Sequence, residues 1–502
     1  MQAAPSSPGA SAEAIATVAT GRDFDRPVVV LTAVILALAA VRAFVAASIG
    51  LTDDEAYYRL WSLAPAMSYL DHPPMVAWMI AGGRWLAGDT PLGIRLPAVL
   101  GSLIGPFILW RTASNLMGAD LARYAVWIML AMPLMVVGGV IMTPDIPSVL
   151  FWGLAAWALS ELHVSRNANW WLAIGLFAGL GLISKYTNLF LGASILLWLI
   201  WLPGNLRWFK TWQLWIGGAI AALTTTPVLL WNLEHDWASF IKQFGRAGRG
   251  QELTLNYLLE LVGAFFGLAS PFIAALALVG LALIVRSALK RRDPAHIMIA
   301  ALVLPLTAYL LLHALHSRVQ GNWPAPLYPV LAVAAAFAVK STEGLWLRRL
   351  GAVGIATGFL FSAVIYAHAV APLSLMRNMK DPTSQMRGWQ QFALDINNLR
   401  QQYGACRIVT SSYTTTAQLA YYLKGRVPVV QLTEPLRYVH LPPIVSDPTC
   451  PALYVELERR QAKGSLKQRF GEVKLLGRVD RAYAGAPLAG YTTSLVTSPF
   501  RP

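Results

Sequence analysis

The chain has 502 residues, of which 56% are hydrophobic and only 13% are charged, whereas the charged fraction of soluble domains is near 25%. This composition excludes an ordinary soluble enzyme. The 40 Lys and Arg residues exceed the 25 Asp and Glu residues, which gives a net charge of +15. Such an excess is typical of nucleic-acid-binding surfaces, of contacts with anionic lipid, or of loops that set membrane topology.

Apolar runs of about 20 residues, the length that crosses a bilayer, recur along the first 372 residues. The first run begins at Val28, which is too late for a cleaved signal peptide, so we expect it to remain as a spanning helix. An odd number of spans places the two ends of the chain on opposite sides of the membrane. The sequence predicts about eleven, at residues 28–50, 93–113, 121–142, 146–164, 169–186, 187–202, 212–231, 257–285, 294–314, 322–340 and 349–370.

Basic residues of this part gather in loops that all lie on one side if the spans alternate. By the positive-inside rule that side is the cytoplasm. We therefore expect a cytoplasmic tail at residues 1–26, a membrane domain at 27–372 and no nucleic-acid partner. The basic residues concerned are Arg22, Arg26, Arg207, Lys210, Arg286, Lys290, Arg291, Arg292, Lys340, Arg348 and Arg349.

Hydropathy falls after about residue 372, and residues 373–502 hold 17 of the 40 basic residues. The segment Thr415–Leu423 has helical character and lies between two strand-like runs. We expect a mainly α polytopic membrane protein with a soluble α/β domain at residues 373–502, in the periplasm. Its predicted strands are Arg407–Thr410, Val427–Gln431, Leu453–Leu457 and Val473–Val479.

The two cysteines of the chain, Cys406 and Cys450, both lie in this last segment, each just before a predicted strand. In an oxidising compartment they could form a disulfide. Two buried unpaired thiols are an equal alternative, because the sequence does not place their Cβ atoms.

The first outer loop, residues 51–92, is the most informative segment. It begins with three consecutive carboxylates, Asp53, Asp54 and Glu55, which are costly at the edge of a bilayer unless they are solvated or bind a cation. They could cap a helix and complement its dipole, or they could act in catalysis. Both interpretations can hold, because a capped helix is a rigid mount for a catalytic carboxylate.

Five short motifs of the outer loops resemble the GT-C superfamily of bacterial membrane glycosyltransferases. The resemblance is to the branch with protein mannosyltransferases, aminoarabinose transferases of lipid A and rhizobial lipopolysaccharide galacturonosyltransferases. It covers about residues 28–370. The motifs are Asp-Glu-Ala-Tyr-Tyr at 54–58, Asp-His-Pro-Pro at 71–74, Thr-Pro-Asp at 143–145, Ser-Lys-Tyr-Thr at 184–187 and Gly-Asn-Trp-Pro-Ala-Pro at 321–326.

The resemblance implies a polyprenyl-phosphate-linked sugar as donor and an inverting transfer to an acceptor hydroxyl on the periplasmic face of the inner membrane. We expect the acceptor to be lipid A, lipopolysaccharide or another envelope glycolipid, with membrane lipids as further partners. In this family the Asp of the Asp-Glu pair is the general base, which maps to Asp54. A neighbouring carboxylate can raise its pKa by like-charge repulsion, and the candidates are Glu55, Asp53 and Asp145.

The leaving phosphate needs a countercharge more than a proton. The resemblance assigns this role to Lys185, at an outer turn between two short spans, although a lysine there can also reach the interface without a ligand. Further candidates are Arg84, Arg318 and His316. One position departs from the family, because the aminoarabinose transferases carry a phosphate-binding Arg two positions after the Asp-Glu pair, where this chain has Tyr57.

Other polar and aromatic residues on the same predicted face are candidates for the substrate cavity: Tyr57, Tyr58, Asp71, His72, His235, Asn322 and Trp323. The polar loop at 232–256 could close over substrates, or it could be a solvated connection near anionic lipid. A divalent metal is possible, but no ligand spacing demonstrates one and no cofactor is required. The histidines and acid considered for it are His235, Asp71, His72, His313 and His316.

Two other functions remain open at this point. A secondary transporter or lipid flippase would call for ionisable residues at mid-membrane, whereas the acids of this chain cluster at span ends on one face. A protein O-glycosyltransferase would keep the enzyme class and change the acceptor to the hydroxyl of Ser or Thr.

Overall fold

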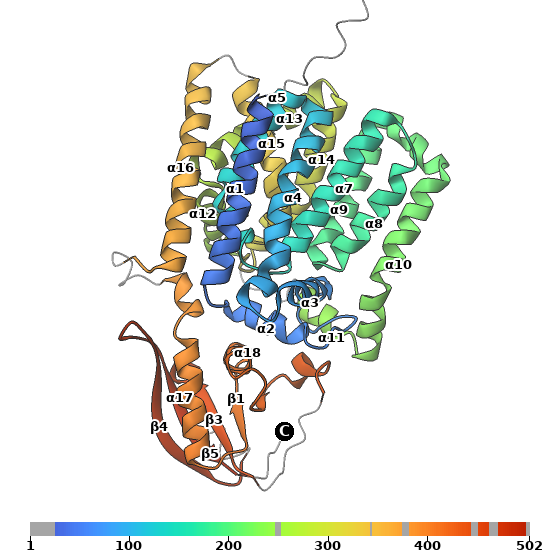
Figure 1. Cartoon of the computed structure of the whole chain (residues 1–502). Helices are drawn as coiled ribbons and strands as arrows, with labels where there is room; N and C mark the ends of the chain where they lie inside the picture. The colour runs from blue at the N-terminus through green and yellow to red at the C-terminus, as the bar shows by residue number, and fades with distance from the viewer. Residues whose placement is uncertain are drawn as a thin grey trace, which may run out of the picture.

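The computed structural model describes residues 26–245, 253–341, 344–373, 381–442, 450–460 and 470–497. In these residues the chain forms a bundle of helices with a smaller α/β unit at one end (Figure 1). We call that end of the bundle the domain face. Residues 1–25 of the expected cytoplasmic tail and the centre of the polar loop, with Arg246 and Arg249, lie outside the described residues.

Most helices of the bundle lie where the apolar runs predict them. Close packing depends on small residues, which let helix backbones approach: a Cβ at Gly280 would lie 1.8 Å from the carbonyl oxygen of Ala334. The helices are α1 (Arg26–Ser48), α4 (Pro91–Met117), α5 (Ala119–Ala131), α6 (Pro133–Gly138), α7 (Asp145–Ser165), α8 (Trp170–Leu182), α9 (Leu189–Trp201), α10 (Trp212–Glu234), α12 (Asn256–Ala269), α13 (Pro271–Lys290), α14 (Pro294–Ala314), α15 (Tyr328–Lys340) and α16 (Leu345–Val370).

The expected number of eleven spans is not confirmed. Six of the described helices are long and apolar enough to cross a membrane, or seven if the bent pair Tyr186–Trp201 and Pro203–Lys210 is one span. Two of the predicted runs are broken, at Pro133 between α5 and α6 and at Ser270 between α12 and α13. Proline lacks the backbone donor that a helix needs, and Ser270 has a φ of 73°, which an α-helix does not accommodate.

Three short helices lie across the domain face: α2 (Asp53–Trp61), α3 (Met75–Ala87) and α11 (Ala238–Phe244) (Figure 1). Helix α2 starts with a capping box, in which Thr52 accepts from the Glu55 amide and the Glu55 carboxylate accepts from the Thr52 amide. The three carboxylates therefore occupy its first turn, where they complement the helix dipole. The capping interpretation is confirmed, and it gives Asp54 a rigid mount.

The α/β unit contains a five-stranded sheet in the order β2-β1-β3-β5-β4. Strand β1 pairs in parallel with β2 and β3, while β5 is antiparallel to β3 and β4. The four predicted strands are confirmed, whereas β5 was not predicted. The elements are α17 (Trp389–Gln402), β1 (Arg407–Thr410), α18 (Tyr413–Tyr422), β2 (Val429–Gln431), β3 (Ala452–Leu457), β4 (Val473–Tyr483) and β5 (Ala486–Val496).

Cys406 and Cys450 form a disulfide, with their Cα atoms 6.0 Å apart. The bond joins the residue before β1 to a residue just before β3. Of the two alternatives that the sequence left open, the structure contains the disulfide.

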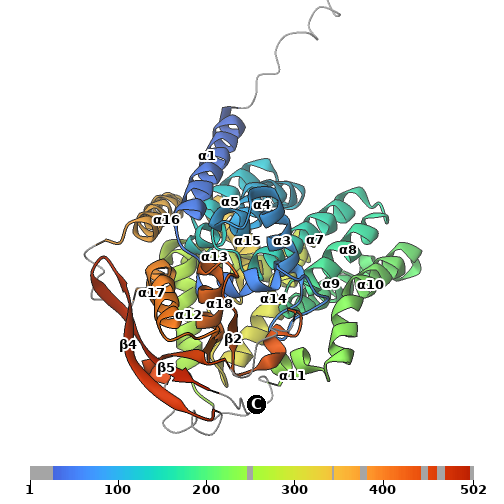
Figure 2. The same ribbon diagram turned by 60° about the horizontal axis from the view of Figure 1, so that its bottom comes forward.

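Helix α18 joins the sheet to the bundle. Its Gln418 side chain donates to the carbonyl oxygen of Leu51 and to Asp53 Oδ1, both at 3.1 Å. Figure 2, in which the domain face comes forward, shows α18 near the centre of this face. The α/β unit is therefore docked directly on the loop that carries the Asp-Glu pair.

Candidate active site

A cavity of about 560 Å³ opens at the domain face and is lined by residues of both the bundle and the α/β unit. Its wall comes from α2, the loop after it, the start of α7, the turn before α9, and the loop before α15. These segments are far apart in the sequence, so the fold brings most of the outer-loop motifs together. The predicted site residues in the wall are Asp54, Tyr57, Tyr58, Asp71, His72, Asp145, Lys185, Asn322 and Trp323.

Asp54 lies in the first turn of α2 and faces this cavity. The Tyr413 hydroxyl, from α18, donates to Asp54 Oδ1 at 3.1 Å. Loss of solvation in the cavity raises the pKa of Asp54, and the charges of Asp53 and Asp71 raise it further, whereas the hydrogen bond from Tyr413 lowers it. A carboxylate with a raised pKa is a better proton acceptor, as a general base requires.

Lys185 and Asp145 form a buried ion pair, with 2.5 Å between Lys185 Nζ and Asp145 Oδ1. The Asn322 amide donates to the other carboxylate oxygen of Asp145 at 2.6 Å. Asp145 is held by its position as the first residue of α7, and Lys185 precedes the short helix Tyr186–Asn188. The ammonium group is thereby fixed in the cavity wall, where an anion can bind it without a rearrangement of the backbone.

Asp71 is held by three donors. The Tyr57 hydroxyl donates to it at 2.9 Å, Lys242 Nζ lies 2.9 Å away, and Arg437 forms a charged hydrogen bond with the same oxygen as Tyr57. The Arg437 guanidinium also lies over the rings of Tyr57 and Tyr413, 5.5 and 4.8 Å from their centroids. These cation–π contacts and ion pairs fix its position in the cavity wall.

Arg437 and Tyr413 are cavity residues that the sequence analysis did not select. Arg437 comes from the short helix Pro435–Tyr438 of the α/β unit, and Glu434 before it binds the guanidinium at 2.9 Å. Glu434 also lies 3.1 Å from Lys242 of α11, which ties the unit to the bundle. The family motifs lie before residue 370, so only the tertiary structure brings these two residues into the site.

Glu55 lies outside the cavity, although it is adjacent to Asp54. Its carboxylate is fully buried and accepts from Arg95 at 2.6 and 2.7 Å and from the Met142 amide at 2.9 Å. With the capping bond to Thr52, these contacts occupy both oxygens. Glu55 therefore anchors the first outer loop to α4, and among the neighbouring charges it makes the smallest contribution to the raised pKa of Asp54.

The other cations predicted for the donor phosphate also lie away from the cavity. Arg84 pairs with Asp89 at 2.8 Å. Arg318 is exposed and pairs with Glu260 at 2.7 Å. His316, near Arg318, is likewise not a cavity-lining residue. The structure thus leaves Lys185 and Arg437 as the Lys and Arg side chains that line the cavity.

His235 does not join the cavity residues, because it stacks on Trp231 with 4.1 Å between ring centroids. In the part of the chain that the structure describes, no group of three or more His, Cys, Asp or Glu side chains is arranged to hold a metal ion. The possible metal ligands of the sequence analysis are therefore not assembled there.

Known proteins share parts of this sequence. Residues 71–231 match the family model of dolichyl-phosphate-mannose-protein mannosyltransferases. The lipid A galacturonosyltransferase RgtD of Rhizobium johnstonii is 28% identical over 378 residues, which cover 74% of this chain and 77% of the relative. A polyprenol-phosphate-mannose–protein mannosyltransferase of Corynebacterium glutamicum is 26% identical over 231 residues, or 39% of this chain and 44% of that protein.

The fold has a counterpart among solved structures. The crystal structure of ArnT from Cupriavidus metallidurans bound to undecaprenyl phosphate superposes with a TM-score of 0.64 at 15% identity, and covers 93% of this chain and 97% of ArnT. Its apo form superposes with a TM-score of 0.63. The family model and the sequence relatives are those of glycosyltransferases, and together with this shared fold they support a membrane glycosyltransferase of the GT-C superfamily.

Proposed function

We propose that the protein transfers a sugar from a polyprenyl-phosphate carrier to a hydroxyl of lipid A or a related envelope glycolipid, on the periplasmic face of the inner membrane. The observation that carries this proposal is that Asp54 and Lys185 line one cavity, since the reaction needs a base on one side of the anomeric carbon and a cation on the other. The name of RgtD supports the acceptor class, and the lipid bound to ArnT supports the carrier.

In the proposed reaction, Asp54 takes the proton of the acceptor hydroxyl, and the oxygen attacks the anomeric carbon from the face opposite the phosphate. The new C–O bond forms as the bond from this carbon to the phosphate oxygen breaks, which inverts the anomeric centre. The bonding electrons leave with the carrier phosphate, which gains one negative charge. Lys185 stabilises that charge in the transition state, and Asp145 positions Lys185.

We assign Arg437 as the second countercharge. Its Nη1 lies 3.2 Å from the hydroxyl of Tyr57, and Tyr57 occupies the position at which the aminoarabinose transferases carry an Arg. The α/β unit would thus supply the cation that the first loop lacks. An incoming phosphate would compete with Asp71 for the guanidinium, and Tyr57 and Lys242 would continue to satisfy Asp71.

A second cavity, of about 210 Å³ between α8, α9 and α10, suits the prenyl chain of the donor. Leu189 lines both this cavity and the catalytic one, and it follows Lys185 by four residues. The walls are apolar apart from Asn188, and they are widened by Gly192 and Gly218, where an added Cβ would meet no atom within 4 Å. A phosphate bound at Lys185 would therefore have a hydrocarbon-lined path for its chain.

The proposal is tested with purified protein in proteoliposomes, supplied with polyprenyl-phosphate sugars and lipid A. We expect Asp54→Asn to lower the rate of transfer about 10²- to 10⁴-fold, the usual contribution of a general base. Asp53→Asn is the matched control, because Asp53 binds Gln418 outside the cavity, and it should stay within a few-fold of wild type. Transfer by Asp54→Asn at the wild-type rate would overturn the assignment.

Protein Ser or Thr is the alternative acceptor, which the family model and the Corynebacterium relative favour by name. Mass spectrometry of lipid A and of envelope proteins from a deletion strain separates the two. Loss of one hexose- or pentose-type increment from lipid A supports our proposal, whereas loss from proteins alone supports the alternative.

A further inference from the structure

Arg42, in α1, is a buried cation without a carboxylate partner in the described part of the chain. Its side chain is 2% exposed. Its Nη1 lies 3.4 Å from the carbonyl oxygen of Ser102, and its Nε has no hydrogen-bond partner. The hydroxyl of Tyr366 also contacts it, but that group is neutral and donates to the carbonyl of Val136.

This arrangement is energetically unusual. A guanidinium has five N–H donors, and a buried charge that no counterion neutralises is among the most costly features of a folded protein. The cost is greater in a helix that is apolar enough to cross a membrane, as α1 is. An anion bound from outside the described part of the protein would remove the energetic cost of this buried charge.

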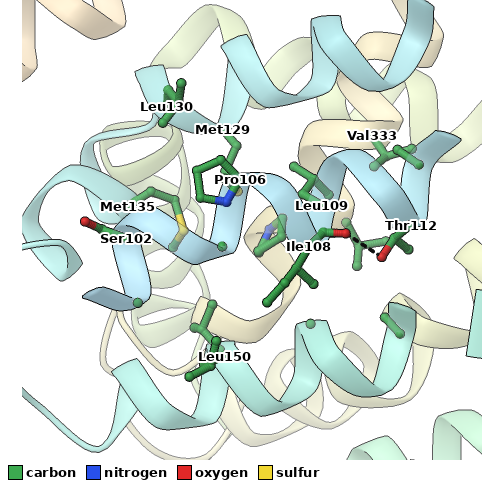
Figure 3. A pocket seen from close by; sticks show the side chains of 18 of the residues that line it. Ser102, Pro106, Ile108, Leu109, Thr112, Met129, Leu130, Met135, Leu150 and Val333 are labelled. Carbon is green, nitrogen blue, oxygen red and sulfur yellow. Dashed lines mark hydrogen bonds between the residues drawn. The ribbon is translucent and has the colours of Figure 1, made fainter. Parts of the chain in front are cut away.

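Arg42 lines a narrow apolar cavity between α4, α5, α7 and α15, which we call the slot (Figure 3). Its volume is about 100 Å³. Along α4 its wall runs from Gly101 to Leu116, which is about 22 Å at 1.5 Å per residue. Arg42 is the one charged side chain of this wall. The hydroxyl of Thr112 donates to the carbonyl oxygen of Ile108 at 2.8 Å.

The polarity of the slot suits hydrocarbon, and its volume of about 100 Å³ can take up part of one hydrocarbon chain. Figure 3 shows Pro106, Leu109, Met135, Leu150 and Val333 around it. Water would find too few polar partners there, because an apolar cavity does not offer the two to four hydrogen bonds that a buried water makes. A chain of methylene groups would instead bury its surface against these side chains.

The position of Arg42 suits a lipid headgroup. It lies six residues before the end of α1 at Ser48, about 9 Å from the domain face, and it contacts Ser102 at the end of the slot nearer that face. Gly139 makes room for it, because a Cβ at Gly139 would lie 2.8 Å from Arg42 Cδ and Nε. The chain runs on from Gly139 to Asp145 of the catalytic cavity.

We propose that the slot binds an anionic phospholipid of the leaflet on the domain-face side, with its phosphate on Arg42 and part of one hydrocarbon chain along α4. A guanidinium binds phosphate oxygens through two parallel hydrogen bonds. The site is separate from the donor site, since the slot shares no lining residue with the catalytic cavity or with the cavity at α8, α9 and α10. The lipid would brace α1, α4 and the segment that leads to Asp145.

The test measures thermal unfolding of the delipidated full-length protein in a non-ionic detergent, with phosphatidylglycerol or with diacylglycerol of the same chains. We expect phosphatidylglycerol, but not diacylglycerol, to raise the Tm of the wild type. Without lipid, Arg42→Met should raise the Tm, because it removes an unneutralised buried charge. The same variant should no longer respond to phosphatidylglycerol, and native mass spectrometry should show binding at least about tenfold weaker.

A second variant tests the slot with Arg42 in place. A Cβ at Gly105 meets no atom within 4 Å, so Gly105→Leu should fold, fill part of the slot and lose the response to phosphatidylglycerol. Arg84→Met is the matched control, because Arg84 pairs with Asp89 outside the slot, and it should keep the response. Asp54→Asn should also keep it, so that this test is independent of the proposed function.

Three results would overturn the proposal. A lower Tm of lipid-free Arg42→Met with an intact response to phosphatidylglycerol would make Arg42 a structural residue only. An equal response of the wild type to diacylglycerol would remove the role of the phosphate. Stronger stabilisation by polyprenyl phosphate than by phosphatidylglycerol, lost in Gly105→Leu, would assign the slot to the carrier lipid.

Discussion

The cavity of the candidate active site and the slot differ in how their cations are paired. In the candidate active site, Lys185 and Arg437 each have a carboxylate partner, Asp145 and Asp71. In the slot, Arg42 has none among the described residues. The comparison suggests two kinds of ligand. A paired cation can exchange a carboxylate for a transient phosphate without exposing a bare charge, whereas an unpaired cation requires a ligand that stays.

Among these cations, removal of the Lys185 ammonium should have the largest effect on transfer. We expect Lys185→Ala to lower kcat/KM for the polyprenyl-phosphate sugar about 10²- to 10³-fold, because the charge that develops on the leaving phosphate loses its stabilising group. The measurement is steady-state transfer in proteoliposomes. Lys340→Ala, at the far end of α15 where Lys340 lies over the Tyr124 ring, is the control. Near-wild-type transfer by Lys185→Ala would place the donor phosphate elsewhere.

The apolar runs predicted most helices of the bundle but not the number of spans. Length and hydropathy predict where an apolar helix lies, whereas single residues decide whether an apolar run forms one helix or two. The run at 257–285 contains a Ser-Pro step, and Ser270 takes up a left-handed backbone conformation that ends α12 before Pro271 starts α13. β5 was missed because it consists mostly of polar and small residues, which do not form the apolar pattern of a strand. It forms through its pairing with β3 and β4.

The sequence predicted those residues of the candidate site that belong to the outer-loop motifs. Asp54 and Glu55 show the limit, because one step along an α-helix turns the side chain by about 100°. Asp54 then faces the cavity, and Glu55 faces Arg95 of α4. No pattern in the loop itself reveals which carboxylate meets the arginine. Arg437 and Tyr413 could not be predicted, because they reach the cavity only through docking of the α/β unit on α2.

A smaller effect should come from the cation that the α/β unit supplies. We expect Arg437→Gln to lower kcat/KM for the donor about tenfold, chiefly through a higher KM, because one of two charges on the phosphate is lost while Asp71 keeps two donors. Arg478→Gln is the control from the same unit, since Arg478 pairs with Asp480 on the exposed strand β4. An unchanged KM would show that Arg437 serves only to dock the unit.

The smallest predicted effect is a shift in the pH dependence of transfer. Tyr413→Phe removes the hydrogen bond that lowers the pKa of Asp54 and keeps the ring on which Arg437 lies. Because the base must be ionised, the acid limb of kcat/KM against pH should move to higher pH, while the rate above neutral pH stays nearly constant. A hydrogen bond to a charged group contributes about 1.5 kcal/mol, which corresponds to a shift of about one pH unit.

Tyr421→Phe is the matched control for this shift. It removes a hydroxyl from the same helix, α18, on a ring that packs beneath Arg59 rather than against Asp54, so its acid limb should coincide with that of the wild type. A shift of the Tyr413→Phe limb to lower pH, or no shift, would mean that Asp54 is not the group whose ionisation starts the reaction. The α/β unit would then bind the loop without tuning its base, and its contribution to the cavity would reduce to the charge of Arg437.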